Sequence, residues 1–167
     1  MDTSIEARLA RLETIEIIRQ LKARYFNACD KKDSERMRNC FAEGEVHIDY
    51  GAIGCFNHRD GLIDIFEKMG GGANIIDLHH GQNAEIDVLD ASHARADWGL
   101  FFYQIDTESQ QLSQLGGHYQ DEYQCIEGQW KITSTIFRVH SSYIAKLADG
   151  AQAQQLQVLF AGGQPAF

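Results

Sequence analysis

The chain of 167 residues is long enough for one domain, at roughly 150 residues per domain, and it needs no disulfide or metal to stabilise its core. Fifteen Lys and Arg against 24 Asp and Glu give a net charge of −9, which argues against nucleic-acid binding, because such proteins concentrate positive charge on one face. No apolar run approaches the roughly 18–20 residues that span a bilayer. The acidic residues 1–6 lack the features of a signal peptide, so we expect a cytoplasmic protein with neither membrane nor nucleic-acid partners.

The N-terminal part of the chain predicts helices. Between Ile5 and Cys29, apolar residues recur at steps of three or four, which places them on one face of a long helix. Residues 3–6 fit a capping box at its start. Asp33-Ser34 opens a short second helix. A third helix is expected to start from a cap within Asn57–Asp60 and to end at the glycine run Gly70–Gly72, which a helix tolerates poorly.

Strands follow the helices. Beyond the glycine run the hydrophobic period changes from 3.6 to 2 residues, which is typical of β-strands. The run Leu100–Ile105 is nearly continuous in apolar residues and is expected to be covered on both sides. Glu127-Gly128 predicts a hairpin turn, and Gln152–Phe160 predicts a closing helix. Helices followed by antiparallel strands indicate the α+β class, with the helices on one side of a curved sheet. The other strands are expected at Val46–Tyr50, Ala84–Val88, Ala94–Trp98, His118–Cys125 and Trp130–Ile132.

The sequence carries one half of a metal-binding pattern. His47-Ile48-Asp49 matches the H-x-D part of a two-His-one-carboxylate iron site, for which His79, His118 or His140 could supply the third ligand. Alternating residues on a half-buried strand produce this half-motif by chance, and the four cysteines lack the close C-x-x-C pairs of a zinc site. Glycine-rich nucleotide-binding motifs are absent. We therefore expect no metal and no cofactor.

An acid and a histidine form the pair that points to catalysis. Asp30 follows the apolar face at the end of the first helix, and His79-His80 stands just before the expected first strand of the main sheet. A buried carboxylate needs a hydrogen-bond donor, because burying it unpaired is costly. An imidazole N–H in that role would fix the tautomer and leave the other ring nitrogen as a base. The alternative is that Asp30 caps a helix end or faces water, and that His79 is an ordinary strand residue.

Three sequence blocks resemble the SnoaL-like branch of the nuclear transport factor two-like superfamily, in the subgroup of scytalone dehydratase, bile-acid 7α-dehydratase and hexachlorocyclohexane dehydrochlorinase. The blocks are Y-x4-D at Tyr25–Asp30, H-x3-N at His79–Asn83, and G-G-x-Y-x-D-E-Y…G-x-W-K at Gly116–Lys131. The resemblance covers Ile5 to Ile132. It implies a single domain over residues 1–167, folded as a cone-shaped α+β barrel in which a curved, mostly antiparallel sheet holds the N-terminal helices on its concave side.

The resemblance also implies an activity. It assigns His79 as the general base and Asp30 as its orienting partner, with His80 as the alternative base, and it assigns Tyr25 to the substrate's oxygen. The implied protein is a cofactor-free lyase, of the dehydratase or dehydrohalogenase type, or an isomerase. It would remove a proton from carbon of a hydrophobic, cyclic small molecule.

Further substrate-binding residues follow from the same resemblance. Tyr50 and Tyr119 fall near positions that line the pocket in this family. The dehydrochlorinase carries an arginine five residues after its Trp, where this chain has Thr135, and the nearest arginine is Arg138. The second histidine of scytalone dehydratase corresponds roughly to Gln104. These departures weaken the transfer of the exact substrate or reaction of those enzymes, so the elimination of scytalone or of a polychlorinated ring is not assumed for this chain.

Two other functions remain open, since one fold hosts many functions. The chain could be a non-catalytic small-molecule-binding or assembly module, or a polyketide-cyclase-like enzyme that uses the same pair differently. An Asp30–His79 contact within about 3 Å that faces a closed apolar cavity would favour the enzyme.

The large apolar groups within Trp98–Tyr103 predict a homo-oligomer, and the resemblance favours a trimer over a dimer. The run Gly70–Gly72 either simply ends the third helix or also gates the cavity.

Overall fold

Helices precede strands along the chain, as the hydrophobic periods predict. The computed structural model describes residues 4–146, 160–161 and 164–165. The predicted closing helix Gln152–Phe160 lies outside the described residues except for Phe160, which begins a short strand. The elements are α1 (Ile5–Asp30), α2 (Ser34–Arg38), β1 (Glu45–Asp49), a 3-10 turn (Gly51–Ile53), β2 (Cys55–His58), α3 (Arg59–Gly70), β3 (Ile75–Val88), β4 (His93–Asp106), β5 (Gln111–Ile126), β6 (Gln129–Lys146), β7 (Phe160–Ala161) and β8 (Gln164–Pro165).

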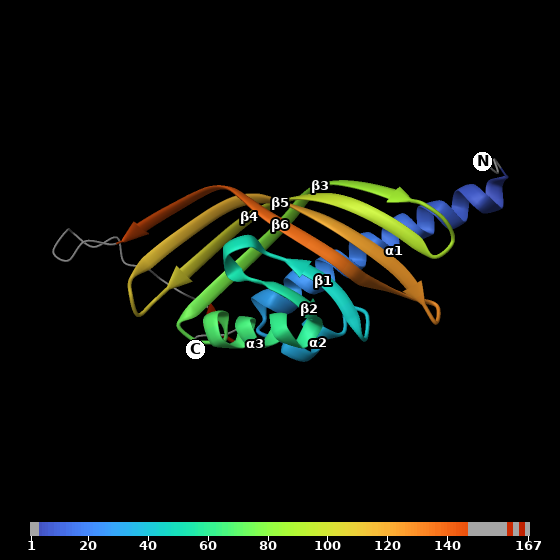
Figure 1. Cartoon of the computed structure of the whole chain (residues 1–167). Helices are drawn as coiled ribbons and strands as arrows, with labels where there is room; N and C mark the ends of the chain where they lie inside the picture. Colours follow the sequence, from blue (N-terminus) through green and yellow to red (C-terminus); the bar gives the residue numbers. More distant parts are fainter. Residues whose placement is uncertain (1–3, 147–159, 162–163, 166–167) are drawn as a thin grey trace.

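Six strands form one strongly curved sheet in the order β2-β1-β6-β5-β4-β3. All neighbouring pairs are antiparallel except β1 and β6, which run parallel. The two edge strands, β2 and β3, do not pair with each other, so the cone remains open. All three helices lie on the concave side of the sheet (Figure 1). This arrangement confirms the predicted α+β class and the placement of the N-terminal helices. Among the described residues, no helix combines the length and apolar character that crossing a membrane requires.

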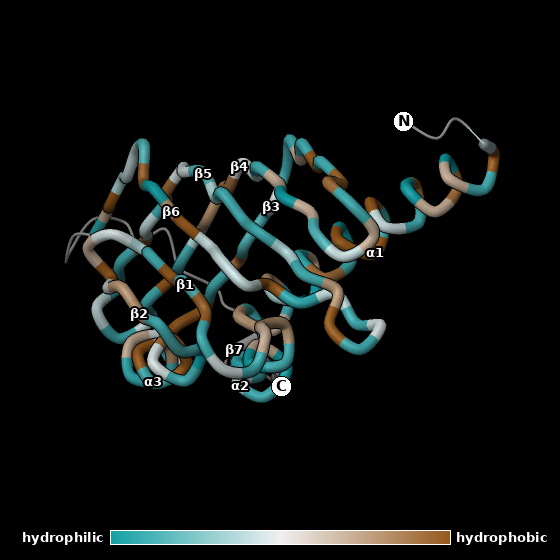
Figure 2. Tube along the Cα trace, turned by 45° about the vertical axis from the view of Figure 1, so that its right-hand side comes forward, coloured by the Kyte–Doolittle hydropathy of each residue, from teal (hydrophilic) through white to brown (hydrophobic). Residues whose placement is uncertain are grey.

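Helix α1 is only half buried along its predicted apolar stripe. Ser4 caps the helix, because its Oγ accepts a hydrogen bond from the backbone N–H of Ala7, whereas Thr3 lies outside the described residues. The first turns extend beyond the sheet and keep apolar residues in solvent (Figures 1 and 2). The stripe is exposed at Ile5, Leu9 and Leu12, and buried at Ile18, Leu21, Tyr25 and Cys29.

Strand β3 begins earlier than the alternation of its residues predicts. It starts at Ile75, so His79-His80 lies inside the strand and not before it. A bulge between Gln82 and Glu85, with Asn83 at φ +53°, interrupts the regular alternation and hides the first half of the strand. Because residues two apart on a strand share a face, the early start of β3 places Asp77 on the same face as His79.

The glycine run ends α3 where the sequence predicts. The helix stops at Gly70, and a Cβ on Gly71 would lie 2.5 Å from the carbonyl oxygen of Glu67, so the close approach requires glycine. This contact supports a helix end, and a gating role for the run stays a prediction. The run Leu100–Ile105 was expected to be covered on both sides, but Phe101 is 42% exposed within this chain, because the helices cover the concave side alone.

Candidate active site

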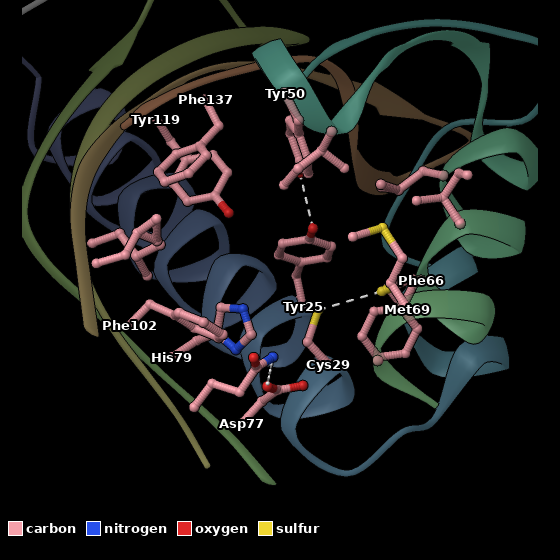
Figure 3. Close-up of a pocket in the computed structure, with 18 residues that line it drawn as sticks. Tyr25, Cys29, Tyr50, Phe66, Met69, Asp77, His79, Phe102, Tyr119 and Phe137 are labelled. Carbon is pink, nitrogen blue, oxygen red and sulfur yellow. Dashed lines mark hydrogen bonds between the residues drawn. The ribbon is translucent and has the colours of Figure 1, made fainter. Parts of the chain in front are cut away.

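A cavity of about 250 Å3 lies between the concave face of the sheet and the helices (Figure 3). Its wall is mostly apolar and aromatic, which suits a hydrophobic molecule, and the cavity is open to solvent on one side. The wall is supplied by the three helices, by the 3-10 turn with the preceding Tyr50, and by inward-facing residues of β3, β4, β5 and β6. The main lining residues are Tyr25, Cys29, Tyr50, Leu62, Phe66, Met69, Asp77, His79, Leu100, Phe102, Gln104, Leu115, Tyr119 and Phe137.

Asp30 and His79 are in direct contact at this wall. The His79 Nδ1 lies 2.6 Å from the Asp30 Oδ1, and the His79 backbone N–H lies 3.1 and 3.2 Å from the two carboxylate oxygens. Both side chains are largely buried. A carboxylate at a helix C-terminus is disfavoured by the helix dipole, and these hydrogen bonds offset that cost. Because Nδ1 must carry a hydrogen to donate to the carboxylate, Nε2 keeps a free lone pair.

Two phenyl rings hold the imidazole of His79 between α1 and the sheet. Phe26 stacks on it with ring centroids 5.6 Å apart and an interplanar angle of 14°, and Phe102 packs at 4.6 Å (Figure 3 shows the Phe102 side). A Cβ at Gly81 would lie well inside 3.0 Å of the Phe26 ring, closer than non-bonded carbons approach. The absence of a side chain at Gly81 therefore allows Phe26 to reach the histidine.

Three phenols stand in the cavity, as the resemblance implies. The Tyr25 and Tyr50 hydroxyls lie 2.8 Å apart, and Tyr119 stacks on Phe137 with ring centroids 4.4 Å apart (Figure 3). Burial raises the pKa of Tyr25, Tyr50 and Tyr119, so all three stay neutral at physiological pH. Since one hydroxyl of the Tyr25–Tyr50 pair donates to the other, the second hydroxyl hydrogen can be donated to a ligand oxygen.

A fully buried ion pair, Lys22–Asp121, packs against the ring of Tyr119. The Lys22 Nζ lies 2.7 Å from the Asp121 Oδ2 and 3.7 Å from the centroid of the Tyr119 ring. Desolvation lowers the pKa of Lys22. Tyr123 and Thr135 donate hydroxyl hydrogen bonds to Asp121 at 2.6 and 2.7 Å. The sequence signals for this pair are that Lys22 stands within the buried part of the α1 stripe and that Asp121 lies between two tyrosines on the same buried face of β5.

Asp77 is a second carboxylate that the sequence analysis did not single out. It lines the cavity two residues before His79, forms an ion pair with Lys32, and accepts a hydrogen bond of 2.9 Å from the Gln104 Nε2. The signal that could have found it is the spacing to His79, since alternate residues of one strand share a face. The early start of β3 concealed that relation.

Three residues that the sequence analysis considered lie away from this cavity. The side chain of Arg138 is 52% exposed and pairs with Asp49, so the structure does not bring it to the other candidate residues. His80 is exposed, and it is His79 that faces Asp30. His47, of the H-x-D half-motif, is exposed on β1. Within the described ranges no three His, Cys, Asp or Glu side chains cluster as metal ligands would.

Comparisons with known proteins agree with this fold. The sequence profile of the SnoaL-like domain matches residues 10–136. A scytalone dehydratase-like protein of Novosphingobium aromaticivorans superposes with a TM-score of 0.75 at 19% identity, over 89% of this chain and 98% of the other. The hexachlorocyclohexane dehydrochlorinase LinA-type3 of Novosphingobium barchaimii gives 0.72 at 19% identity, over 89% and 99%. A cystatin-like protein of unknown function from Nostoc punctiforme gives 0.59 at 21% identity, over 83% and 95%. Identities this low show the shared fold alone.

Proposed function

The chain belongs to the SnoaL-like domain family, and on that premise we propose that it is a lyase that needs no cofactor and acts on a hydrophobic, cyclic small molecule. The observation that carries the proposal is the 2.6 Å contact between Asp30 and His79 at the wall of an apolar cavity. A module that only binds a ligand has no need of a base held in one tautomer. The lyase relatives among the known structures support the same class of reaction.

In the proposed reaction, the Nε2 of His79 takes a proton from a substrate carbon. The electron pair of that C–H bond becomes a double bond, and the leaving group on the neighbouring carbon departs as hydroxide or halide. Asp30 stabilises the imidazolium that forms. A departing hydroxide takes the proton from His79 and leaves as water, whereas after loss of a halide the proton passes from His79 to solvent. In an isomerisation no group departs, and the proton returns to another carbon. Such a base contributes roughly 10²–10⁴-fold to the rate.

The phenols determine which carbon acids can react. Tyr25, paired with Tyr50, donates a hydrogen bond to the substrate oxygen on which negative charge collects, and Tyr119 lies beside them in the cavity. A donor of this kind contributes about 10²–10³-fold. Together the base and the donor suffice for a carbon acid next to a carbonyl or a conjugated ring. The cavity of about 250 Å3 is at the small end for ligand pockets, which favours a compact ring system.

The test uses cyclic ketones that carry a hydroxyl or a halide on the β-carbon, because their elimination gives a conjugated product that absorbs ultraviolet light. We expect His79→Ala to lose roughly 10²–10⁴-fold in turnover. His80→Ala is the matched control, since His80 is the next residue and is exposed, and it should keep the wild-type rate. Equal turnover in His79→Ala and wild type would refute the proposal, and binding of the ketones without turnover in the wild type would assign a binding module.

We further propose a homo-oligomer, with a trimer favoured over a dimer. Large apolar side chains remain exposed on the convex face of the sheet and on the first turns of α1, and another subunit would cover them. Phe101→Glu should weaken association, whereas Leu89→Glu in the β3–β4 turn should not. Light scattering at micromolar concentration measures both, and a monomeric wild type would contradict the proposal. The cytoplasmic location inferred from residues 1–6 also stays a prediction.

A further inference from the structure

A hydrogen-bonded carboxylate–imidazole pair and an ion pair join the same two short segments of the chain. Asp30, the last residue of α1, binds His79 of β3, and Lys32, two residues further along, binds Asp77, two residues earlier on β3. Asp77 and His79 therefore face the same cavity, side by side in Figure 3. Their Cα atoms are about 7 Å apart, at the rise of a β-strand. At that distance a charge on Asp77 acts on the imidazole.

Lys32 is held in place at some cost. It has φ +58°, a left-handed conformation that residues other than glycine rarely adopt. Its ammonium lies 5.7 Å from the centroid of the Phe66 ring, and its side chain is 9% exposed. A buried ion pair adds little to folding stability compared with neutral residues of similar shape. The strained backbone and the burial together indicate that the charge of Lys32 serves the site.

The negative charge of Asp77 gives a reason for a buried lysine at position 32. Asp77 is 5% exposed and, if it were unpaired, would favour the protonated form of His79, in which Nε2 carries a hydrogen and is no base. The other titratable groups around His79 are neutral, paired or, like Arg19 and His80, exposed to solvent that screens their charge. Burial raises the pKa of Cys29 and of the tyrosines, and Lys22 is paired with Asp121. The titratable and charged groups around His79 are Arg19, Lys22, Tyr25, Cys29 and Asp30 of α1, Lys32 after it, Tyr50 after β1, Asp77 and His80 of β3, and Tyr119 of β5.

We propose that Lys32 is a positioning residue that neutralises Asp77, so that His79 responds to the charge of Asp30 and is shielded from the charge of Asp77. The inference rests on the proposed function for its catalytic meaning. Its electrostatic content does not, because it concerns the protein without substrate. Asp77, held by Lys32 and Gln104, then presents a neutralised carboxylate to the cavity beside the base.

The test follows the ring protons of His79 by NMR as the pH changes, in the full chain without substrate. In Lys32→Met, the unpaired Asp77 should move the His79 titration midpoint to higher pH by about half a unit or more, about threefold in the protonation equilibrium. In Asp77→Asn, the unpaired Lys32 should move it to lower pH. The double variant Lys32→Met/Asp77→Asn should return it to the wild-type midpoint, although it lacks the bridge between the two segments.

These measurements distinguish the effect of the Asp77 charge on His79 from the structural effect of losing the Lys32–Asp77 ion pair, and from any effect on catalysis. Equal midpoints in Lys32→Met and in the double variant, or an unchanged midpoint in Asp77→Asn, would overturn the inference. If Lys32→Met does not fold, Lys32→Arg must keep the wild-type midpoint and Asp77→Asn must still shift it downward, and failure of either also overturns the inference. Midpoints that move as described, in a protein that turns over no cyclic ketone, would refute the lyase and leave the inference standing.

Discussion

The contact between Gly81 and Phe26 offers a test of how the base is oriented. Gly81→Ala places a methyl group well inside 3.0 Å of the Phe26 ring, whereas non-bonded carbons rest at about 3.5–4.0 Å. The ring must therefore move by about 1 Å. Phe26 is buried and stacked on His79, so the displacement reaches the base directly. Overpacking of this kind costs about 1–3 kcal/mol in stability, and a misplacement of about 1 Å at reacting groups costs about 10²-fold in rate.

Urea unfolding measures the first effect, and turnover together with the NMR signals of the His79 ring measures the second. Gly99→Ala on the neighbouring strand is the matched control, because its Cβ would meet its nearest atom, the carbonyl oxygen of Gln82, at 3.4 Å, an ordinary contact. We expect the control to keep both the His79 signals and the rate. A Gly81→Ala variant with unchanged stability, unchanged His79 signals and full turnover would refute the orienting role of Phe26.

Four further outcomes are expected. Lys22→Met should destabilise the fold by about 3–5 kcal/mol in urea unfolding, because it leaves Asp121 buried and unpaired, and Lys22→Met/Asp121→Asn should recover most of the loss. Asp30→Asn should lower turnover by about 10²–10⁴-fold, since the amide no longer stabilises the imidazolium of His79; full activity would contradict the pairing. Burial raises the pKa of the three cavity tyrosines, so their contribution to stability is complete below about pH 10 and is lost as the pH rises further; tyrosinate absorbance should appear together with unfolding. Chelators should leave turnover unchanged, and a loss restored by ferrous iron would instead assign the H-x-D half-motif a metal.

The helices and most strands can be predicted from the sequence, because the residues that signal them are close together along the chain. The capping aspartate before α2, the glycines after α3 and the turn at Glu127-Gly128, where both residues have positive φ, all lie where the pattern predicts. Arg138 was selected for its distance along the chain from a tryptophan, although the buried Phe137 beside it already indicates that Arg138 faces outward. Asp77 needed a different kind of information, since the bulge after Gln82 breaks the alternation of β3 and so hides the early part of the strand, where Asp77 and His79 share a face.

In the proposed reaction, proton abstraction and substrate recognition use different walls of the cavity. The proposed base, its partner and the Lys32–Asp77 ion pair come from two short segments, residues 30–32 and 77–79, which pair with each other. The opposite wall comes from α3, whose lining residues, such as Leu62 and Phe66, carry no charge. A low-dielectric wall strengthens the Asp30–His79 interaction, and for the same reason it makes an unpaired charge beside the base harmful. Changes on α3 should therefore alter which ring is bound while leaving proton abstraction intact, whereas changes in the two segments should alter the base itself.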